Sequence, residues 1–421
     1  MTTPPGNHAA LLARRARVLA PTYRLFYEQP LQIVRAEGVW MYDASGRRYL
    51  DAYNNVPVVG HCHPQVVDAL TRQARTLNTH TRYLAEQPLQ LAEELLATLP
   101  RELDSVIFTC TGSEANDLAV RISKAVTGGS GFIVTEFAYH GATDVIAGMS
   151  PEDGRPLGPG VYTVAAPLGA DGAAAFGERV GRCLERMQAD GVRLAAMLVD
   201  TIFSSDGVVA DPRGFLTDAV RKVHEAGGLF IADEVQAGFG RLGEAMWGFA
   251  RHGIVPDLVT MGKPMGNGHP VAAVAGRAGV FAGFAKGGSY FNTYGGNSVS
   301  CATALAVLQV IRDESLLENA RRSGEHLMRG LRGLAQRHAA IREVRGAGLF
   351  IGVELGANAA SGRSGAAETR RVVNGLCRRG VLVGSTGRDG NVLKIRSPLT
   401  LELQHADLLL EALDQTLQSR E

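Results

Sequence analysis

The sequence predicts an α/β protein built on a mostly parallel seven-stranded sheet, and three observations support this fold class. Short apolar runs alternate with amphipathic stretches of helical periodicity from about residue 67 to residue 305. Each run is bounded by Gly, Pro or polar residues, and each is apolar throughout, which is typical of parallel strands covered by helices on both faces. The predicted strands are 105–108, 131–135, 161–164, 195–199, 229–232, 258–261 and 271–275.

The two ends of the chain lack this regular alternation. Residues 1–66 combine a helical start with a predicted meander at 31–33, 40–43 and 49–51. After residue 306 come a long helix, strands at 341–348 and 349–354, a helix at 367–379, and strands at 381–383 and 392–395. We therefore expect a large domain at 67–305 and a smaller α+β domain at 306–421, with residues 1–66 joining the small domain.

Composition excludes several classes of partner. The 421 residues carry 43 Lys and Arg against 42 Asp and Glu, a net charge of +1, which gives no electrostatic reason to expect binding to nucleic acid or an anionic membrane. The N-terminus has no signal-peptide order. Five scattered cysteines are typical of reduced thiols. We expect a cytoplasmic protein.

Two of the predicted strands are followed by residues that could act together in one active site. Asp233 follows strand 229–232 and Lys263 follows strand 258–261, and the carboxyl ends of parallel strands meet at one edge of a sheet. An enzyme that uses pyridoxal 5′-phosphate needs a lysine that holds the aldehyde as a Schiff base and a carboxylate that keeps the pyridine nitrogen protonated. Of the five lysines, only Lys263 ends a buried strand. The alternative is a solvated loop lysine in a Gly/Pro-rich turn.

A phosphate site is predicted between strand 105–108 and the helix that follows it. Gly112 and Ser113 would present backbone N–H groups and the positive end of the helix dipole to an anion, although Ser113 and Glu114 could instead cap the helix. The His61-Cys62-His63 sequence suggests a metal cluster, but adjacent residues cannot all bind one ion without strain. We expect no metal site.

Five motifs along almost the whole chain resemble one known family. The motifs are YLDAYNNVPVVGHCHP at 49–64, FTCTGSEANDLAVR at 108–121, FAYHG at 137–141, DEVQAGFGR with GKPMGNGHPVAAV between 233 and 274, and NTYGGNSVSCATALAVL at 292–308. They resemble the class III aminotransferases, the ω-aminotransferase branch of the fold-type-I pyridoxal-phosphate enzymes.

This resemblance implies roles for further residues and a homodimer with shared active sites. Tyr139, which precedes His140 in the YHG motif, would stack on one face of the cofactor ring, and Val235 would press on the other. Gln236 would donate to the phenolic oxygen of the ring. Thr293 would bind the cofactor phosphate of the neighbouring subunit.

Three departures from the family pattern indicate a phosphorylated substrate. Lys394 stands where aminotransferases of this class usually carry a carboxylate-binding arginine, and Asp200 replaces the glutamate that partners it. The segment NTHTRYL contributes Arg82. Together these resemble the branch of phospho-lyases that act on O-phosphoethanolamine or O-phospho-hydroxylysine. Arg82, Lys394 and Arg396 are the candidate substrate-binding residues, with an interface salt bridge as the alternative for Arg82.

The predicted function is therefore elimination of phosphate and ammonia from a small phosphorylated amino alcohol, with Lys263 and Asp233 as the catalytic residues. The alternative is an ω-aminotransferase that moves an amino group from an amine or ω-amino acid to a 2-keto acid. Both reactions share their first steps, so the sequence separates them poorly. A cofactor-binding scaffold without catalysis is disfavoured because Asp233 and Lys263 are both present.

Overall fold

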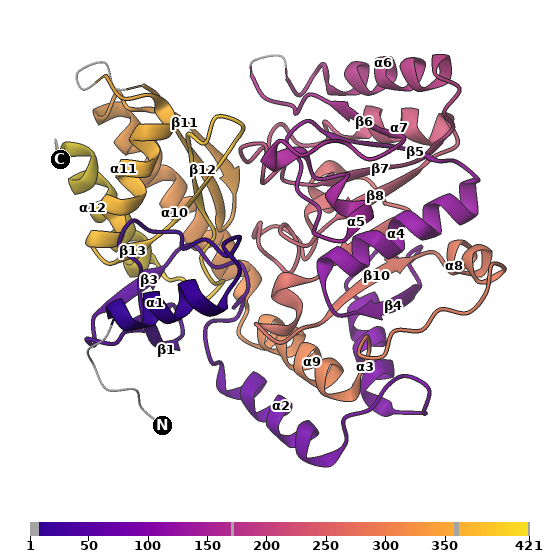
Figure 1. Ribbon diagram of the computed structural model, residues 1–421, viewed down its shortest axis with the longest axis horizontal. Helices are drawn as coiled ribbons and strands as arrows, with labels where there is room; N and C mark the ends of the chain where they lie inside the picture. The colour runs from indigo at the N-terminus through magenta and orange to yellow at the C-terminus, as the bar shows by residue number, and fades with distance from the viewer. Residues whose placement is uncertain (1–7, 170–171, 358–361, 420–421) are drawn as a thin grey trace.

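The central feature of the fold is a seven-stranded sheet, as predicted. The computed structural model describes residues 8–169, 172–357 and 362–419 (Figure 1). The sheet order is β4 (Ser105–Thr109), β10 (Ala272–Gly276), β9 (Leu258–Met261), β8 (Leu229–Asp233), β7 (Leu194–Asp200), β5 (Gly131–Thr135) and β6 (Val161–Val164). Each strand begins and ends within one residue of its predicted bounds. In this sheet β10 runs antiparallel to β4 and β9, and the neighbouring pairs from β9 to β6 are parallel.

Both faces of this sheet are buried, which explains the continuous apolar runs in the sequence. Successive side chains of a strand point to opposite faces. On β7, Leu198 joins one apolar cluster with Leu118 of helix α4 (Gly112–Thr127). Met197 joins a second cluster with Val180 of helix α6 (Phe176–Ala189), on the other face.

The remaining helices of the chain connect and cover the strands (Figure 1). They are α1 (His8–Val18), α2 (Pro64–Thr76), α3 (Glu86–Leu96), α5 (Asp144–Ala147), α7 (Thr217–Glu225), α8 (Ala278–Ala285), α9 (Ser298–Asp313), α10 (Leu316–Arg337), α11 (Gly365–Arg378) and α12 (Leu403–Gln418). Short 3₁₀ helices are η1 (Pro151–Asp153), η2 (Gly248–His252) and η3 (Lys263–Gly266).

Two smaller sheets form the other part of the molecule. One has the order β1 (Ile33–Glu37), β2 (Trp40–Asp43), β3 (Arg48–Asp51) and β13 (Val381–Leu382), and the other β11 (Ile341–Ala347), β12 (Phe350–Leu355), β15 (Val392–Ile395) and β14 (Gly384–Thr386). Because β13 pairs in parallel with β3, the N-terminal strands join the C-terminal part of the chain. The domain boundaries at 66/67 and 305/306 stay predictions.

One expectation about these sheets is wrong in detail, and one strand of the structure was not expected. The predicted strand at 31–33 lies at Ile33–Glu37 instead, since this edge strand exposes Val34 and Arg35 and so shows no apolar run. Strand β14 was not predicted, because its three residues begin with glycine and carry no periodic signal.

The described helices include none that is long and apolar enough to cross a membrane. All five cysteines are free thiols. The cytoplasmic location stays a prediction.

Candidate active site

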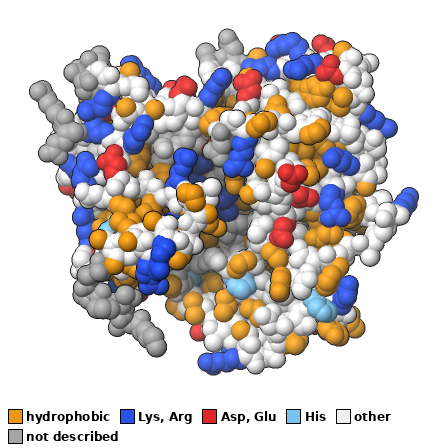
Figure 2. Space-filling view, in the orientation of Figure 1, with side chains coloured by type: hydrophobic (Ala, Val, Ile, Leu, Met, Phe, Trp, Pro, Cys, Tyr) orange, Lys and Arg blue, Asp and Glu red, His pale blue; other side chains and the backbone are white. Residues whose placement is uncertain are grey.

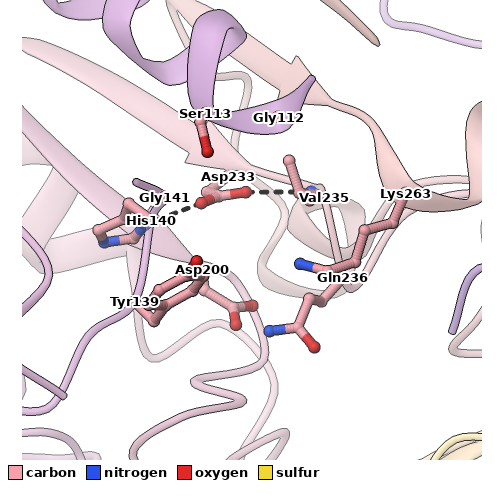
Figure 3. Close-up of a pocket in the computed structure, with 10 residues that line it drawn as sticks. All are labelled: Gly112, Ser113, Tyr139, His140, Gly141, Asp200, Asp233, Val235, Gln236 and Lys263. Carbon is pink, nitrogen blue, oxygen red and sulfur yellow. Dashed lines mark hydrogen bonds and ion pairs between the residues drawn. The ribbon is translucent and has the colours of Figure 1, made fainter. Parts of the chain in front are cut away.

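A cavity of about 210 Å³ lies at the edge of the large sheet where strands β5, β7, β8 and β9 end (Figure 3). This is the edge at which open α/β sheets bind ligands. The cavity is lined by Gly112, Ser113, Tyr139, His140, Gly141, Asp200, Asp233, Val235, Gln236 and Lys263. The fold thus brings together in one chain all the predicted cofactor residues except Thr293.

Asp233 and Lys263 reach the cavity from neighbouring strands. Asp233 is the last residue of β8, and Lys263 begins η3 two residues after β9 ends. The Lys263 side chain extends into the open cavity and is accessible to solvent there (Figure 3). The surrounding protein still lowers its pKa by desolvation, while the negative charge of Asp233 raises it and the positive charge of Arg396 lowers it further. A lowered pKa increases the fraction of neutral, nucleophilic amine.

The start of helix α4 forms a cradle for an anion. Thr111, not Ser113, caps the helix, because its hydroxyl accepts from the Glu114 N–H while Glu114 accepts from the Thr111 N–H. Gly112 and Ser113 therefore remain at the cavity wall (Figure 3). A Cβ at Gly112 would lie 2.9 Å from Cγ2 of Val235, so only glycine fits between the helix and this side chain.

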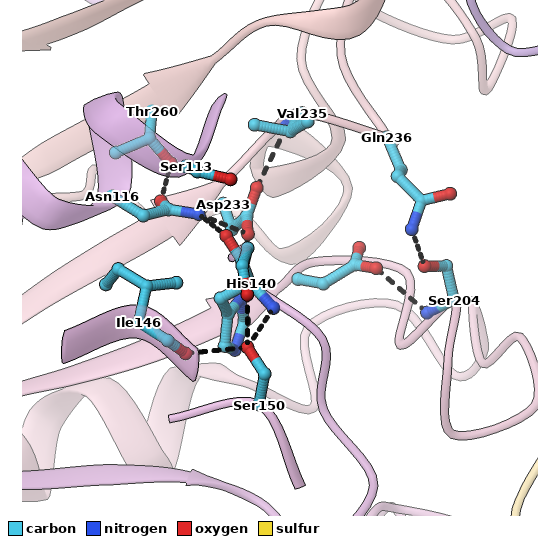
Figure 4. A network of polar contacts seen from close by, with 12 residues as sticks. Ser113, Asn116, His140, Ile146, Ser150, Ser204, Asp233, Val235, Gln236 and Thr260 are labelled. Carbon is cyan, nitrogen blue, oxygen red and sulfur yellow. Dashed lines mark hydrogen bonds and ion pairs between the residues drawn. The ribbon is translucent and has the colours of Figure 1, made fainter. Parts of the chain in front are cut away.

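The Asp233 carboxylate is held by three N–H donors (Figure 4). Its Oδ1 accepts from the Val235 N–H at 3.1 Å. Its Oδ2 lies 2.7 Å from Nδ1 of His140 and accepts from Nδ2 of Asn116 at 3.0 Å. The His140 backbone N–H in turn donates to Oγ of Ser150 at 2.9 Å. His140 thus contacts Asp233, and the carboxylate has one fixed orientation.

Gln236 connects the cavity to a half-buried cation, Arg396. Its Nε2 donates to Oγ of Ser204, and its Oε1 accepts from Nη1 of Arg396 at 2.6 Å. The loop that holds Ser204 depends on Asp200, whose carboxylate accepts from the N–H groups of Ile202 and Ser204 at 3.1 and 3.0 Å. Both the nitrogen and the oxygen of the Gln236 amide therefore already have hydrogen-bond partners.

Lys394 and Arg396 lie together on the side of the cavity that faces the smaller sheets. The Nζ atom of Lys394 is 5.8 Å and the guanidinium carbon of Arg396 is 5.9 Å from the centre of the Phe350 ring. Burial lowers the pKa of Lys394 well below its usual value, and the charge of Arg396 lowers it further, while Glu152 and Asp200 oppose the shift. Figure 2 shows Lys and Arg side chains along the hollow between the two parts of the molecule.

Arg82 and Thr293 do not reach this cavity within one chain. Both are exposed, and the guanidinium carbon of Arg82 lies 3.9 Å from the centre of the Phe291 ring. The backbone N–H of Arg82 donates to Nδ1 of His80 at 3.3 Å. The alternative of a salt bridge at an interface concerns a contact between subunits and stays a prediction. The His61 and His63 rings bond to Asp51 and Glu314, and the described residues contain no cluster suited to a metal.

Sequence reasoning missed three residues that support the site. Asn116 contacts Asp233, Thr260 contacts Asn116, and Ser204 contacts Gln236. A signal existed only for Asn116, which lies three residues after Ser113 and so on the same face of the predicted helix. Thr260 lies inside a strand and Ser204 in a loop, where nothing in the sequence singles them out.

A match to a known protein family shows to which family this chain belongs. The family described as aminotransferase class-III matches residues 25–417. The chain belongs to the class-III aminotransferase family. Its cofactor is pyridoxal 5′-phosphate.

Individual relatives of this class-III family member include lyases and aminotransferases. The chain is 40% identical to a phospholyase from Arthrobacter in complex with phosphoethanolamine, with a TM-score of 0.94, over 98% of this chain and 100% of that one. It is 35% identical to ethanolamine-phosphate phospho-lyase homolog 1 of Caenorhabditis elegans, over 97% and 93% of the two chains. It is also 38% identical to an alanine--glyoxylate aminotransferase 2-like protein of Drosophila melanogaster, over 92% and 82%.

The cavity fits the cofactor in three respects. The start of α4 offers N–H groups for the phosphate beside the space that a Cβ at Gly112 would fill. Asp233 offers an oriented carboxylate for the ring nitrogen. Lys263 offers an amine of lowered pKa in the same cavity.

Proposed function

We propose that this class-III family member is a phospho-lyase that removes phosphate and ammonia from a small phosphorylated amino alcohol such as O-phosphoethanolamine. The observation that carries the proposal is the pair of basic side chains, Lys394 and Arg396, that lie 5.8 and 5.9 Å from the centre of the Phe350 ring beside the cavity. A phosphate dianion needs two positive charges, whereas a single carboxylate needs one arginine fork. The solved phospholyase in complex with phosphoethanolamine, 40% identical to this chain, supports the same substrate class.

We assign Lys263 the roles of cofactor attachment and proton transfer. When bound, pyridoxal phosphate withdraws electrons from the substrate carbon that bears nitrogen, which acidifies the proton on that carbon. The Lys263 amine, with its pKa lowered by desolvation, can accept this proton from within the same cavity. Its position next to Asp233 keeps both groups at one edge of the sheet.

The walls of the cavity would hold the cofactor ring in place. Asp233 would accept a hydrogen bond from the protonated ring nitrogen, and Tyr139 and Val235 would contact the two ring faces. Gly112 and Ser113 would bind the cofactor phosphate. Gln236 would donate to the phenolic oxygen from Nε2, which in this structure donates to Ser204, while its Oε1 accepts from Arg396. Nε2 would therefore either release Ser204 or donate one hydrogen to each partner.

Lys394 and Arg396 would bind the phosphate of the substrate and stabilise it as a leaving group. The arrival of a dianion raises the pKa of a nearby amine, so Lys394 would become fully charged when substrate binds. Loss of phosphate, followed by hydrolysis of the remaining carbon–nitrogen bond, gives phosphate, ammonia and an aldehyde. One water molecule balances this reaction, and no keto acid is consumed.

We propose that two copies of the chain form a homodimer in which Arg82 and Thr293 enter the partner's site. Exposed apolar side chains surround both residues, with Tyr83 at 65%, Leu84 at 103% and Tyr294 at 70% of full exposure. Such a patch is typical of a surface that another protein covers. The exposed Thr293 could then bind the cofactor phosphate across the interface, and Arg82 could approach the substrate.

A second candidate function is ω-amino transfer, because the chain is also 38% identical to the alanine--glyoxylate aminotransferase 2-like protein. The two functions differ in their need for an acceptor. An aminotransferase must pass nitrogen to a keto acid, whereas a lyase releases it as ammonia. Phosphate release from O-phosphoethanolamine, measured with and without pyruvate, therefore separates them.

A further inference from the structure

One buried amide, that of Asn116, joins the carboxylate of Asp233 to the neighbouring strand (Figure 4). Its Nδ2 donates to Oδ2 of Asp233 at 3.0 Å and to the backbone oxygen of His140 at 2.7 Å. Its Oδ1 accepts from the hydroxyl of Thr260 at 2.6 Å. Asn116 and Thr260 are fully buried, and neither lines the cavity.

The Thr260 hydroxyl stabilises the orientation of the Asn116 amide in which the nitrogen faces Asp233 and His140. An amide has two donors on its nitrogen and only acceptors on its oxygen. If the Asn116 amide turned over, its oxygen would face the Asp233 carboxylate and the His140 carbonyl, which are both acceptors. The hydroxyl proton of Thr260 would then lose its acceptor, and each unsatisfied buried group costs about 1–3 kcal/mol.

The pairing of β8 with β9 and the spacing of residues along α4 set this arrangement. Asp233 and Thr260 are direct partners in the β8–β9 ladder, so their side chains lie on the same face of the sheet. Asn116 lies one helical turn after Ser113 on α4, and this turn packs on that face. The helix that offers N–H groups at its start therefore also fixes, one turn later, the carboxylate at the other end of the cavity.

The two oxygens of Asp233 are used unequally. Oδ2 accepts from both Asn116 and His140, so its lone pairs are occupied, whereas Oδ1 accepts, among the residues that the structure describes, only from the Val235 N–H. We propose that Asn116 and Thr260 are positioning residues that hold Oδ1 of Asp233 free for the proton of the cofactor's ring nitrogen. This inference rests on the proposed pairing of Asp233 with that nitrogen.

The test compares how tightly the apo-protein binds two cofactors. One is pyridoxal phosphate, and the other is its analogue in which the ring nitrogen is replaced by C–H, which cannot pair with Asp233. Thr260→Val keeps the shape of the side chain but removes its hydroxyl, and Thr260→Ser restores the hydroxyl. Apparent dissociation constants are measured by absorbance titration, and thermal unfolding checks that each variant is folded.

We expect Thr260→Val to weaken binding of pyridoxal phosphate about tenfold, the effect of one lost buried hydrogen bond, and to change binding of the analogue less than about twofold. Thr260→Ser should behave as the wild type with both cofactors. Equal weakening for the two cofactors, or no weakening for either, would show that Thr260 has no role toward the ring nitrogen and overturn the inference. Thr260→Ala replaces the valine variant if the latter does not fold, with the same expectation.

Asp233→Ala separates failure of the inference from failure of its premise. If Asp233 pairs with the ring nitrogen, this variant loses the preference for pyridoxal phosphate over the analogue. If it keeps the preference, the pairing itself is wrong, and the inference falls with it. If Asp233→Ala loses the preference while Thr260→Val keeps it in full, the pairing stands and only the positioning role is refuted.

Discussion

Nη1 of Arg396 donates to Oε1 of Gln236 across 2.6 Å, which links a cation beside the smaller sheets to the wall of the cofactor cavity. Lys394 lies in β15 and Arg396 directly follows the end of this strand, and both side chains approach the Phe350 ring. The substrate cations and the cofactor wall thus form one connected surface. Loss of positive charge there should affect the substrate and leave the cofactor in place.

Lys394→Met removes this charge and keeps the length of the side chain. We expect it to raise KM for O-phosphoethanolamine and to lower kcat/KM by ~1.5–3 kcal/mol, the value of a hydrogen bond to a charged group. The absorption spectrum of the bound cofactor should not change. Lys286→Met, at an exposed lysine, serves as the matched control and should leave kcat/KM unchanged. Equal kinetics for both variants would remove Lys394 from the substrate site.

Lys263→Ala should abolish turnover and leave the protein folded, because this side chain lies in an open cavity and packs in no apolar core. We expect kcat below about one thousandth of the wild-type value, which corresponds to ~4 kcal/mol in the barrier. Steady-state kinetics measure the loss of turnover, and circular dichroism checks that the variant is folded. A variant that keeps more activity would show that another group transfers the proton.

Asp206 should make stability depend on pH. Burial raises its pKa to about 7, although the Thr135 hydroxyl that donates to it at 2.8 Å opposes the shift. Between the unfolded-state value of 3.8 and about 7, the folded protein holds a proton that the unfolded chain has lost, so stability falls as pH rises through this window.

Asp206→Asn removes this titration and should gain up to ~4 kcal/mol in the free energy of unfolding, relative to wild type, as pH rises from 4 to 8. Urea unfolding of the holoenzyme at several pH values measures the difference. Glu234 titrates in the same direction, so only the difference between variant and wild type is informative. Asp313→Asn, at an exposed carboxylate, is the control and should give no such gain. If the difference in the free energy of unfolding between Asp206→Asn and wild type did not change with pH, the raised pKa of Asp206 would be contradicted.

A shared active site predicts that two inactive variants restore each other. Thr293→Asp places a negative charge where the partner's cofactor phosphate would bind, and Lys263→Ala removes the reactive amine. After subunit exchange, a mixed dimer contains one site with both native residues, so random mixing should give about a quarter of wild-type activity. Two separately inactive samples that stay inactive after verified exchange would place Thr293 outside the partner's site.

The sequence predicted the large sheet closely because its strands are buried on both faces and read as unbroken apolar runs. It placed Asp233 and Lys263 at one edge because parallel strands end together. It could not reveal Thr260, since a threonine inside a strand looks like any other and its role depends on the register between β8 and β9. Nor could it show that Ser204 and Arg396 already use the amide of Gln236.

The central claim is that phosphate leaves the substrate without an acceptor for nitrogen. The most direct measurement is inorganic phosphate and ammonia released from O-phosphoethanolamine by the holoenzyme, with pyruvate absent and then present. We expect equal amounts of phosphate and ammonia, at a rate that pyruvate does not change. No phosphate without pyruvate, together with stoichiometric formation of alanine from pyruvate and an unphosphorylated amine, would contradict the lyase and establish an aminotransferase.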